Sequence, residues 1–200
     1  MSNTNKADSP PSEINIKHQS VNNIEADSVS MKQGSVGDIQ ANRVVVSQAG
    51  AGQVKGEAVE LRQAGAQTVQ GNTIAIRQGG ALQAQADALS ISQGGVIYAE
   101  SQTAQLTASN AGVILANGDV ALDQSISRVI LSRGDVTLDQ SGSGVVVGRT
   151  VTTGDNSGTV LVIAGKVNGN VTSLFGPAAG AAFGAAFAFI FALFLWLRRR

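Results

Sequence analysis

The sequence contains no cysteine, three prolines and one histidine. Without cysteine the chain has no disulfide, no thiolate nucleophile and none of the cysteine-based zinc sites. The one histidine, His18, leaves little for acid–base catalysis or for metal binding by imidazole. The formal net charge is zero, so no overall field attracts the chain to nucleic acid. These absences argue against an enzyme, a cofactor-binding protein and a nucleic-acid-binding protein.

Aromatic residues are almost absent from the first 174 positions. All six phenylalanines and the one tryptophan lie in the last 26 positions, and Tyr98 is the only aromatic residue before them. A core of ordinary thickness normally uses large aromatic side chains. Residues 14–170 must therefore build an interior from Val, Ile, Leu and Ala, and this requires a thin cross-section. Glycine is abundant, with 24 residues, and low proline favours fixed turns over disorder.

From Ile14 onward the sequence repeats itself. One polar column recurs every 15 residues and then, after one added residue, every 16. Its glutamines are Gln33, Gln48, Gln63, Gln78, Gln93, Gln124 and Gln140. This period defines about ten coils, of which the first is 14–28 and the last two are 136–151 and 152–167. A fixed period of this length is typical of a solenoid.

Within each coil, apolar side chains alternate with polar ones and a tight corner follows. Val59 and Leu61, for example, flank Glu60, as a half-buried strand requires. Smaller apolar residues occupy the eighth, eleventh and thirteenth positions, while the sixth and seventh carry corner residues. We therefore predict an all-β fold, a single-stranded parallel β-solenoid (β-helix) of about ten 15–16-residue coils. Stacking at about 4.8 Å per coil would give a rod about 48 Å long with one shared core.

Two different segments flank this solenoid domain, which we place at residues 14–171. Residues 1–13 are polar, contain Pro10-Pro11 and predict a disordered tail without a signal peptide. Residues 172–200 predict one transmembrane helix, because Ala178–Leu197 is a run of 20 apolar or small residues. A helix of that length, about 30 Å, matches the hydrocarbon core of a bilayer. A helix buried in a core is the alternative, but a thin solenoid is too narrow to cover one.

The C-terminal segment also carries an interfacial anchor and a candidate helix-packing face. Trp196 precedes three arginines, Arg198–Arg200, a combination typical of a membrane–water interface. Gly176, Gly180 and Gly184 have the spacing that lets two helices approach closely. Alanine-rich membrane helices also carry this spacing by chance, so helix self-association and coincidence both remain open.

The fourth position of the coils changes sign along the chain. Early coils carry Lys17, Lys32, Arg62 and Arg77, and late coils carry Asp123, Asp139 and Asp155. Solvated like charges at strand spacing repel one another by about 1 kcal/mol per pair. The three aspartates could form a cation ladder for Ca²⁺, or could be relieved by Arg128, by Arg133 or by water. The stripe itself could be a solvated surface, or could pair rods side by side or head to tail.

The glutamine column predicts a structural ladder, since stacked amides hydrogen-bond from coil to coil; a ligand-binding stripe is the alternative. No catalytic constellation is apparent. Glycosidases need two carboxylates in a cleft, whereas coil length here varies by one residue and provides no loops to build a pocket. We therefore expect no catalytic residue, no cofactor and no small-molecule substrate.

The repeat region resembles the bactofilins, bacterial cytoskeletal proteins with a β-helix between short disordered tails. The resemblance is most detailed over residues 162–171, VIAGKVNGNV, which look like the glycine-punctuated coils of that family. It implies end-to-end polymerisation through apolar coil ends. The glutamine column and a C-terminal rather than N-terminal membrane segment depart from the family pattern.

These patterns favour a membrane-tethered structural scaffold that self-associates or forms polymers. Its partners would be the lipid bilayer and further copies of the chain. We expect a single-pass membrane protein with a cytosolic solenoid, inserted late as a tail anchor. The alternative is a surface-displayed adhesion or binding module on a C-terminal sorting-type anchor, with Arg198–Arg200 inside and the rod outside.

Overall fold

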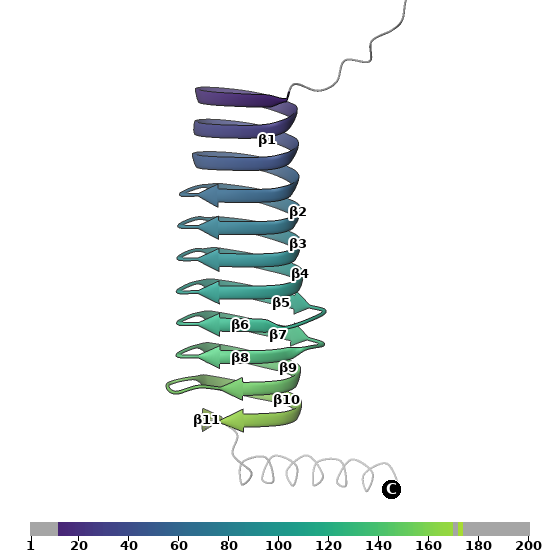
Figure 1. Cartoon of the computed structure of the whole chain (residues 1–200). Helices are drawn as coiled ribbons and strands as arrows, with labels where there is room; N and C mark the ends of the chain where they lie inside the picture. The colour runs from purple at the N-terminus through teal and green to yellow at the C-terminus, as the bar shows by residue number, and fades with distance from the viewer. Residues whose placement is uncertain (1–11, 170–171, 174–200) are drawn as a thin grey trace, which may run out of the picture.

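The computed structural model describes residues 12–169 and 172–173, which form a slender rod of stacked coils (Figure 1). All strands belong to one parallel sheet that winds around the rod axis. The strands are β1 (Glu13–Arg62), β2 (Gly65–Arg77), β3 (Gly80–Ser92), β4 (Gly95–Thr107), β5 (Asn110–Ala116), β6 (Val120–Asp123), β7 (Ile126–Ser132), β8 (Asp135–Asp139), β9 (Gly142–Thr153), β10 (Gly158–Gly169) and β11 (Thr172–Ser173). The strand β1 alone winds through several coils before its first break. The predicted parallel β-solenoid is confirmed.

Successive coils pair in the register that the repeat predicts. Arg62 at the end of β1 lies opposite Arg77 in β2, a shift of 15 residues. In the second half Asp123 in β6 lies opposite Asp139 in β8, a shift of 16. Because pairing is in register, a given position of the coil always lies above the same position of the next coil. Each position therefore forms a column along the rod.

The first added residue lies at a corner. Ser101 pairs with Ala116 at a shift of 15, but Ala104 pairs with Val120 at a shift of 16. The extra residue therefore lies in the turn at residues 117–119. Its backbone is held by the coil above, since Gly118 N donates to Gln102 O at 2.7 Å.

The predicted limits of the last two coils, 136–151 and 152–167, are wrong by one residue. Val151 lies opposite Val136 and is fully buried, so it fills the first inward column, and the coils are 136–150 and 151–166. The added residue is Gly154, which follows Thr153 and donates its backbone N–H to Leu138 O at 2.7 Å. The reason is packing, because a valine side chain gains more from burial than the threonine that follows it.

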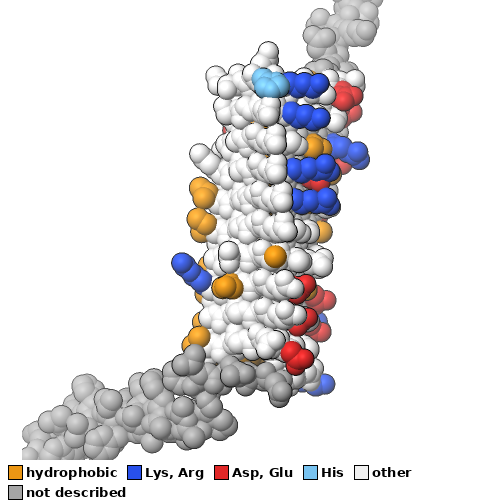
Figure 2. Space-filling model, turned by 90° about the vertical axis from the view of Figure 1, so that its left-hand side faces the viewer, with side chains coloured by type: hydrophobic (Ala, Val, Ile, Leu, Met, Phe, Trp, Pro, Cys, Tyr) orange, Lys and Arg blue, Asp and Glu red, His pale blue; other side chains and the backbone are white. Residues whose placement is uncertain are grey.

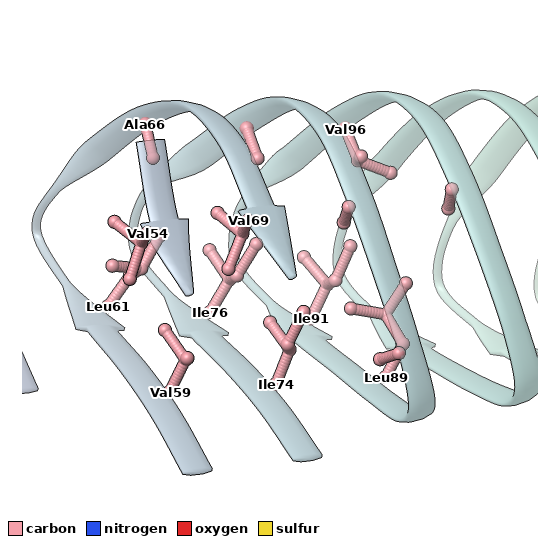
Figure 3. Packing of buried hydrophobic residues seen from close by; sticks show 14 of the residues in the cluster. Val54, Val59, Leu61, Ala66, Val69, Ile74, Ile76, Leu89, Ile91 and Val96 are labelled. Atoms are coloured by element: carbon pink, nitrogen blue, oxygen red, sulfur yellow. The ribbon is translucent and has the colours of Figure 1, made fainter. Parts of the chain in front are cut away.

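Two inward columns of large aliphatic side chains form one wall of the core (Figure 3). The first includes Val29, Val44, Val59, Ile74 and Leu89, and the third position supplies Met31, Val46, Leu61, Ile76, Ile91, Leu106, Leu122 and Leu138. All of these are at most 3% exposed. Val54 and Leu61, from facing walls of successive coils, point toward each other in Figure 3. Two layers of aliphatic side chains fill the interior, which explains why this region needs no phenylalanine or tryptophan.

Several predicted features lie outside the described residues. They are residues 1–11 of the tail, Ala178–Leu197, Arg198–Arg200 and the glycines Gly176, Gly180 and Gly184. Over residues 12–169 and 172–173 there is no helix that is long and apolar enough to cross a membrane. The strand β11 pairs with Gly158 and Thr159 of β10. The sheet therefore extends two residues past our predicted limit at residue 171, because one further coil brings the chain back to the pairing edge.

Truncation of one core leucine tests this packing. We expect Leu61→Ala to lower the free energy of unfolding by about 2–5 kcal/mol, because Leu61 is fully buried and the aliphatic layers cannot collapse around the cavity. Leu131→Ala is the matched control, since Leu131 is 40% exposed and should cost about 1 kcal/mol or less. Urea denaturation followed by circular dichroism measures both. Equal losses would contradict the assigned interior.

Candidate functional site, the ladder face of the rod

One column of the rod has a left-handed backbone in every coil. In the described part of the chain, ten non-glycine residues have φ between 46° and 58°, all at the fifth position of a coil. They are His18, Gln33, Gln48, Gln63, Gln78, Gln93, Ala108, Gln124, Gln140 and Asn156. A residue with a Cβ in this conformation costs about 1–2 kcal/mol. The sharpest bend thus falls at the glutamine column rather than at the sixth and seventh positions, where glycine led us to expect it.

The glutamine side chains of this column form a hydrogen-bonded ladder. Each Nε2 donates to the Oε1 of the next glutamine, with distances of 3.2, 3.0, 3.2 and 3.1 Å from Gln33 to Gln93. The run ends there because the next residue, Ala108, has no amide. Gln124 and Gln140 continue the column with the same backbone conformation. Each amide bond contributes about 0.5–1.5 kcal/mol, which offsets part of the left-handed strain.

A second ladder, buried and made of serines, begins where the glutamine ladder stops. It occupies the sixth position with Ser109, Ser125, Ser141 and Ser157, all at most 6% exposed. Ser109 N donates to Ser125 Oγ at 3.1 Å, and Ser125 Oγ donates to Asp123 O at 2.8 Å. These bonds were not predicted from the sequence. The available signal was the change at the sixth position, from Ala or Gly between residues 34 and 94 to Ser from residue 109 onward.

The fourth position forms the charged column, which lies beside the glutamine ladder. The pairing register links Arg62, Arg77, Ser92, Thr107, Asp123 and Asp139 in one line. Figure 2 shows the result as a basic upper half and an acidic lower half of one stripe. At the upper end of the column, Lys17 and Lys32 line the same groove as Arg62 and Arg77. At the lower end, Gln140 N donates to Asp155 O, which places Asp155 in the column below Asp139.

Among the described residues of the basic half, only the two nearest the centre of the rod have a counter-ion. Glu60 Oε1 lies 2.8 Å from Arg62 Nε and 3.8 Å from Arg77 Nε. The hydrogen bond from Arg62 is the main cause that lowers the pKa of Glu60. Within the part of the chain that the structure describes, Lys17, Lys32, Asp123, Asp139 and Asp155 form no ion pair.

The candidate cation ladder consists of one carboxylate per coil. Asp123 lies opposite Asp139, and Asp155 continues the line. Among the described residues, no group of three or more acidic or histidine side chains is placed to hold a metal ion. The acidic half is therefore a linear stripe of exposed charge, suited to a long partner of opposite sign.

An apolar column runs along the other side of the same face. At the seventh position the outward residues are mostly glycines, such as Gly50, Gly65 and Gly80. Near the middle of the rod, Leu82 and Ile97 project from the ninth position and are 54% and 62% exposed. Figure 2 shows most of the hydrophobic side chains on one side of this face and most of the charged ones on the other, with one basic side chain among the hydrophobic ones. Arg128 lines the same apolar groove as Leu82 and Ile97. We call the charged column, the glutamine column and this apolar column together the ladder face.

Comparison with protein-family models, with curated proteins and with solved structures gave no match. What the chain shares with the bactofilins is therefore the parallel β-solenoid architecture, and no family membership is shown. The function must be argued from the ladder face and the ends of the rod.

Substitution of one ladder glutamine separates backbone strain from amide bonding. We expect Gln63→Ala to lower the free energy of unfolding by about 1–2 kcal/mol, because it removes two amide bonds and keeps the left-handed strain. Gln63→Gly should be about 1 kcal/mol more stable than Gln63→Ala, because glycine has no Cβ. At Gln70, an outward strand position without positive φ, the order should reverse. If Gln63→Ala proved as stable as Gln63→Gly, the proposed left-handed strain at this position would be disproved.

The buried serines give a second matched pair. We expect Ser125→Ala to cost about 1–3 kcal/mol, because it leaves the buried Ser109 N–H without its acceptor. Ser101→Ala should be neutral or stabilising, because Ser101 Oγ is buried and lacks a hydrogen-bond partner in the described structure. Both are measured by urea denaturation. Similar losses at the two positions would argue against the serine ladder.

Proposed function

We propose that the protein is a non-catalytic, membrane-tethered structural scaffold whose rods self-associate. The observation that carries this proposal is an uninterrupted stack of coils. The larger hollows on the described surface follow stacked outer columns, such as the groove beside the glutamine ladder. They run along the rod, so they suit a partner that lies along it better than a compact substrate.

The ends of the rod supply one route to self-association. Among the described residues, the first coil and the last coil each have a neighbour on one side only. An unpaired strand edge is a template for another strand. The last long strand, β10, also exposes Leu161, Ile163 and Val167 at 44–55%. Burial of such side chains against another copy would stabilise an end-to-end contact.

Tethering rests on the hydrophobic run Ala178–Leu197 and the arginines that follow it. We place the rod in the cytosol, with the C-terminal segment inserted as a tail anchor. The second candidate is an outward-facing adhesion or binding module, which the positive-inside tendency of Arg198–Arg200 favours. Protease protection of the rod in intact cells, compared with opened cells, distinguishes the two. Digestion only after opening supports the cytosolic scaffold.

Self-association is tested with the full chain in detergent. We expect sedimentation velocity and electron microscopy to show dimers or longer assemblies that grow with protein concentration. Ile163→Asp combined with Val167→Asp should shorten end-to-end assemblies, because Val167 lies in the inward column below the buried Val151 and a charge there would be buried at the contact. Leu131→Asp, in the same outward column as Ile163 but two coils farther from this end, is the control. Monomeric rods at every concentration tested would rule out the scaffold.

A further inference from the structure

The charged column has opposite signs in its two halves, with uncharged Ser92 and Thr107 between them. Like charges stacked directly opposite one another repel. Glu60 relieves this repulsion at Arg62 and Arg77. The outer members, Lys17 and Lys32 at one end and the three aspartates at the other, have no such relief within residues 12–169. A partner that carries the opposite sign at each end would relieve this repulsion.

We propose that two rods pair side by side and antiparallel through their ladder faces, so that the partner is a second copy of this chain. The proposal rests on the proposed self-association and defines one of its interfaces. The two-fold axis is perpendicular to the rods and to the line that joins them. Each column of one rod then faces the same column of the other rod, and the two columns run in opposite directions. The basic half of each rod then faces the acidic half of its neighbour, as a closed symmetric dimer requires.

One register satisfies the charges at both ends. We number the coils from coil 1, residues 14–28, to coil 10, residues 151–166. Pairing coil 1 with coil 10 of the partner, coil 2 with coil 9, and so on, places Lys17 opposite Asp155 and Lys32 opposite Asp139. Symmetry makes each of these contacts twice. Four of the five column side chains that lack an ion pair within the described rod thus acquire one each, and the fifth, Asp123, lies opposite Ser47.

The same register also matches the apolar column. Coil 5 meets coil 6 at the two-fold axis, so Leu82 lies opposite Ile97 of the second copy, and both are more than half exposed in the single rod. Coil 3 meets coil 8, so the exposed Ile126 lies opposite Gly50. Nothing lies within 4 Å of a Cβ built at Gly50, which leaves space for a side chain there. Charge and shape therefore select one register independently.

An acidic polymer is the competing partner for the basic half. It would neutralise Lys17 and Lys32 but would leave Asp139 and Asp155 without a counter-ion. The antiparallel copy accounts for both halves with one contact.

Charge reversal tests the pairing. In the full chain in detergent, we expect Lys17→Asp/Lys32→Asp and Asp139→Lys/Asp155→Lys each to raise the dissociation constant of the lateral dimer at least tenfold at low salt. Each variant places like charges opposite one another at both ends. Mixing the two variants should restore the affinity, since every reversed charge then meets its opposite. Added salt should weaken the wild-type dimer. Circular dichroism spectra like that of the wild type confirm that the variants fold.

Cross-linking tests the orientation, and the absence of native cysteine makes it specific. We expect a chain carrying Gly50→Cys to be joined to a chain carrying Ile126→Cys by a thiol cross-linker that spans about 10 Å. Neither variant should cross-link efficiently to itself. In the antiparallel dimer two copies of the same position lie five coils apart, about 24 Å.

The outcomes separate this proposal from the proposed function. Self-linking of Gly50→Cys at the efficiency of the mixed pair would show parallel packing and overturn the proposal. So would end-to-end filaments that form without lateral dimers, although these would leave the scaffold function standing. Binding of polyphosphate by the basic half, with no effect of Asp139→Lys/Asp155→Lys on association, would assign that half to an acidic polymer. A chain that is monomeric throughout would overturn both proposals.

Discussion

Parallel backbone pairing between successive coils is the interaction on which the rest of this structure depends. It fixes each residue directly above the residue 15 or 16 positions later, as in Arg62 above Arg77 and Asp123 above Asp139. One coil cannot bury its apolar side chains alone, but a stack shares a continuous interior. The effect of a residue on stability therefore depends on the residues directly above and below it in the same column.

The columns explain why the two halves of the rod use different chemistry for the same bend. The fifth position is left-handed in every coil, and the first half stabilises the bend with amide bonds between glutamines such as Gln48 and Gln63. In the second half, buried hydroxyls such as that of Ser125 bond the backbone of the neighbouring coil. Ala108 lies at the junction, with the strain but without an amide. The charged column also changes sign across this junction, so the rod has two halves on one continuous fold.

The fold could be predicted from the sequence because the 15–16-residue repeat and the alternation of apolar and polar residues together show which positions stack in columns. Val59, Leu61 and their counterparts repeat at fixed spacing, and this alone specifies the inward face. The left-handed bend could not be predicted, because glutamine has no preference for that conformation and the nearby glycines indicated a later corner. The added residue at Gly154 was misplaced because the glutamine spacing shows that one residue is extra but not which one. For the candidate site, the repeat showed which charged residues share a column. Which of these residues form no ion pair in the described rod could be established only from the structure.

The central claim is the coil-by-coil register, and distances between spin labels test it most directly. The positions labelled in Gln67→Cys and Arg128→Cys lie four coil spacings apart along the rod, and those in Gln67→Cys and Val160→Cys lie six apart. At about 4.8 Å per spacing the two backbone separations are about 19 and 29 Å. The account predicts two narrow distributions, in monomeric protein diluted with unlabelled chain, that differ by about 10 Å. Broad distributions, or distances that do not increase in proportion to the coils crossed, would contradict it.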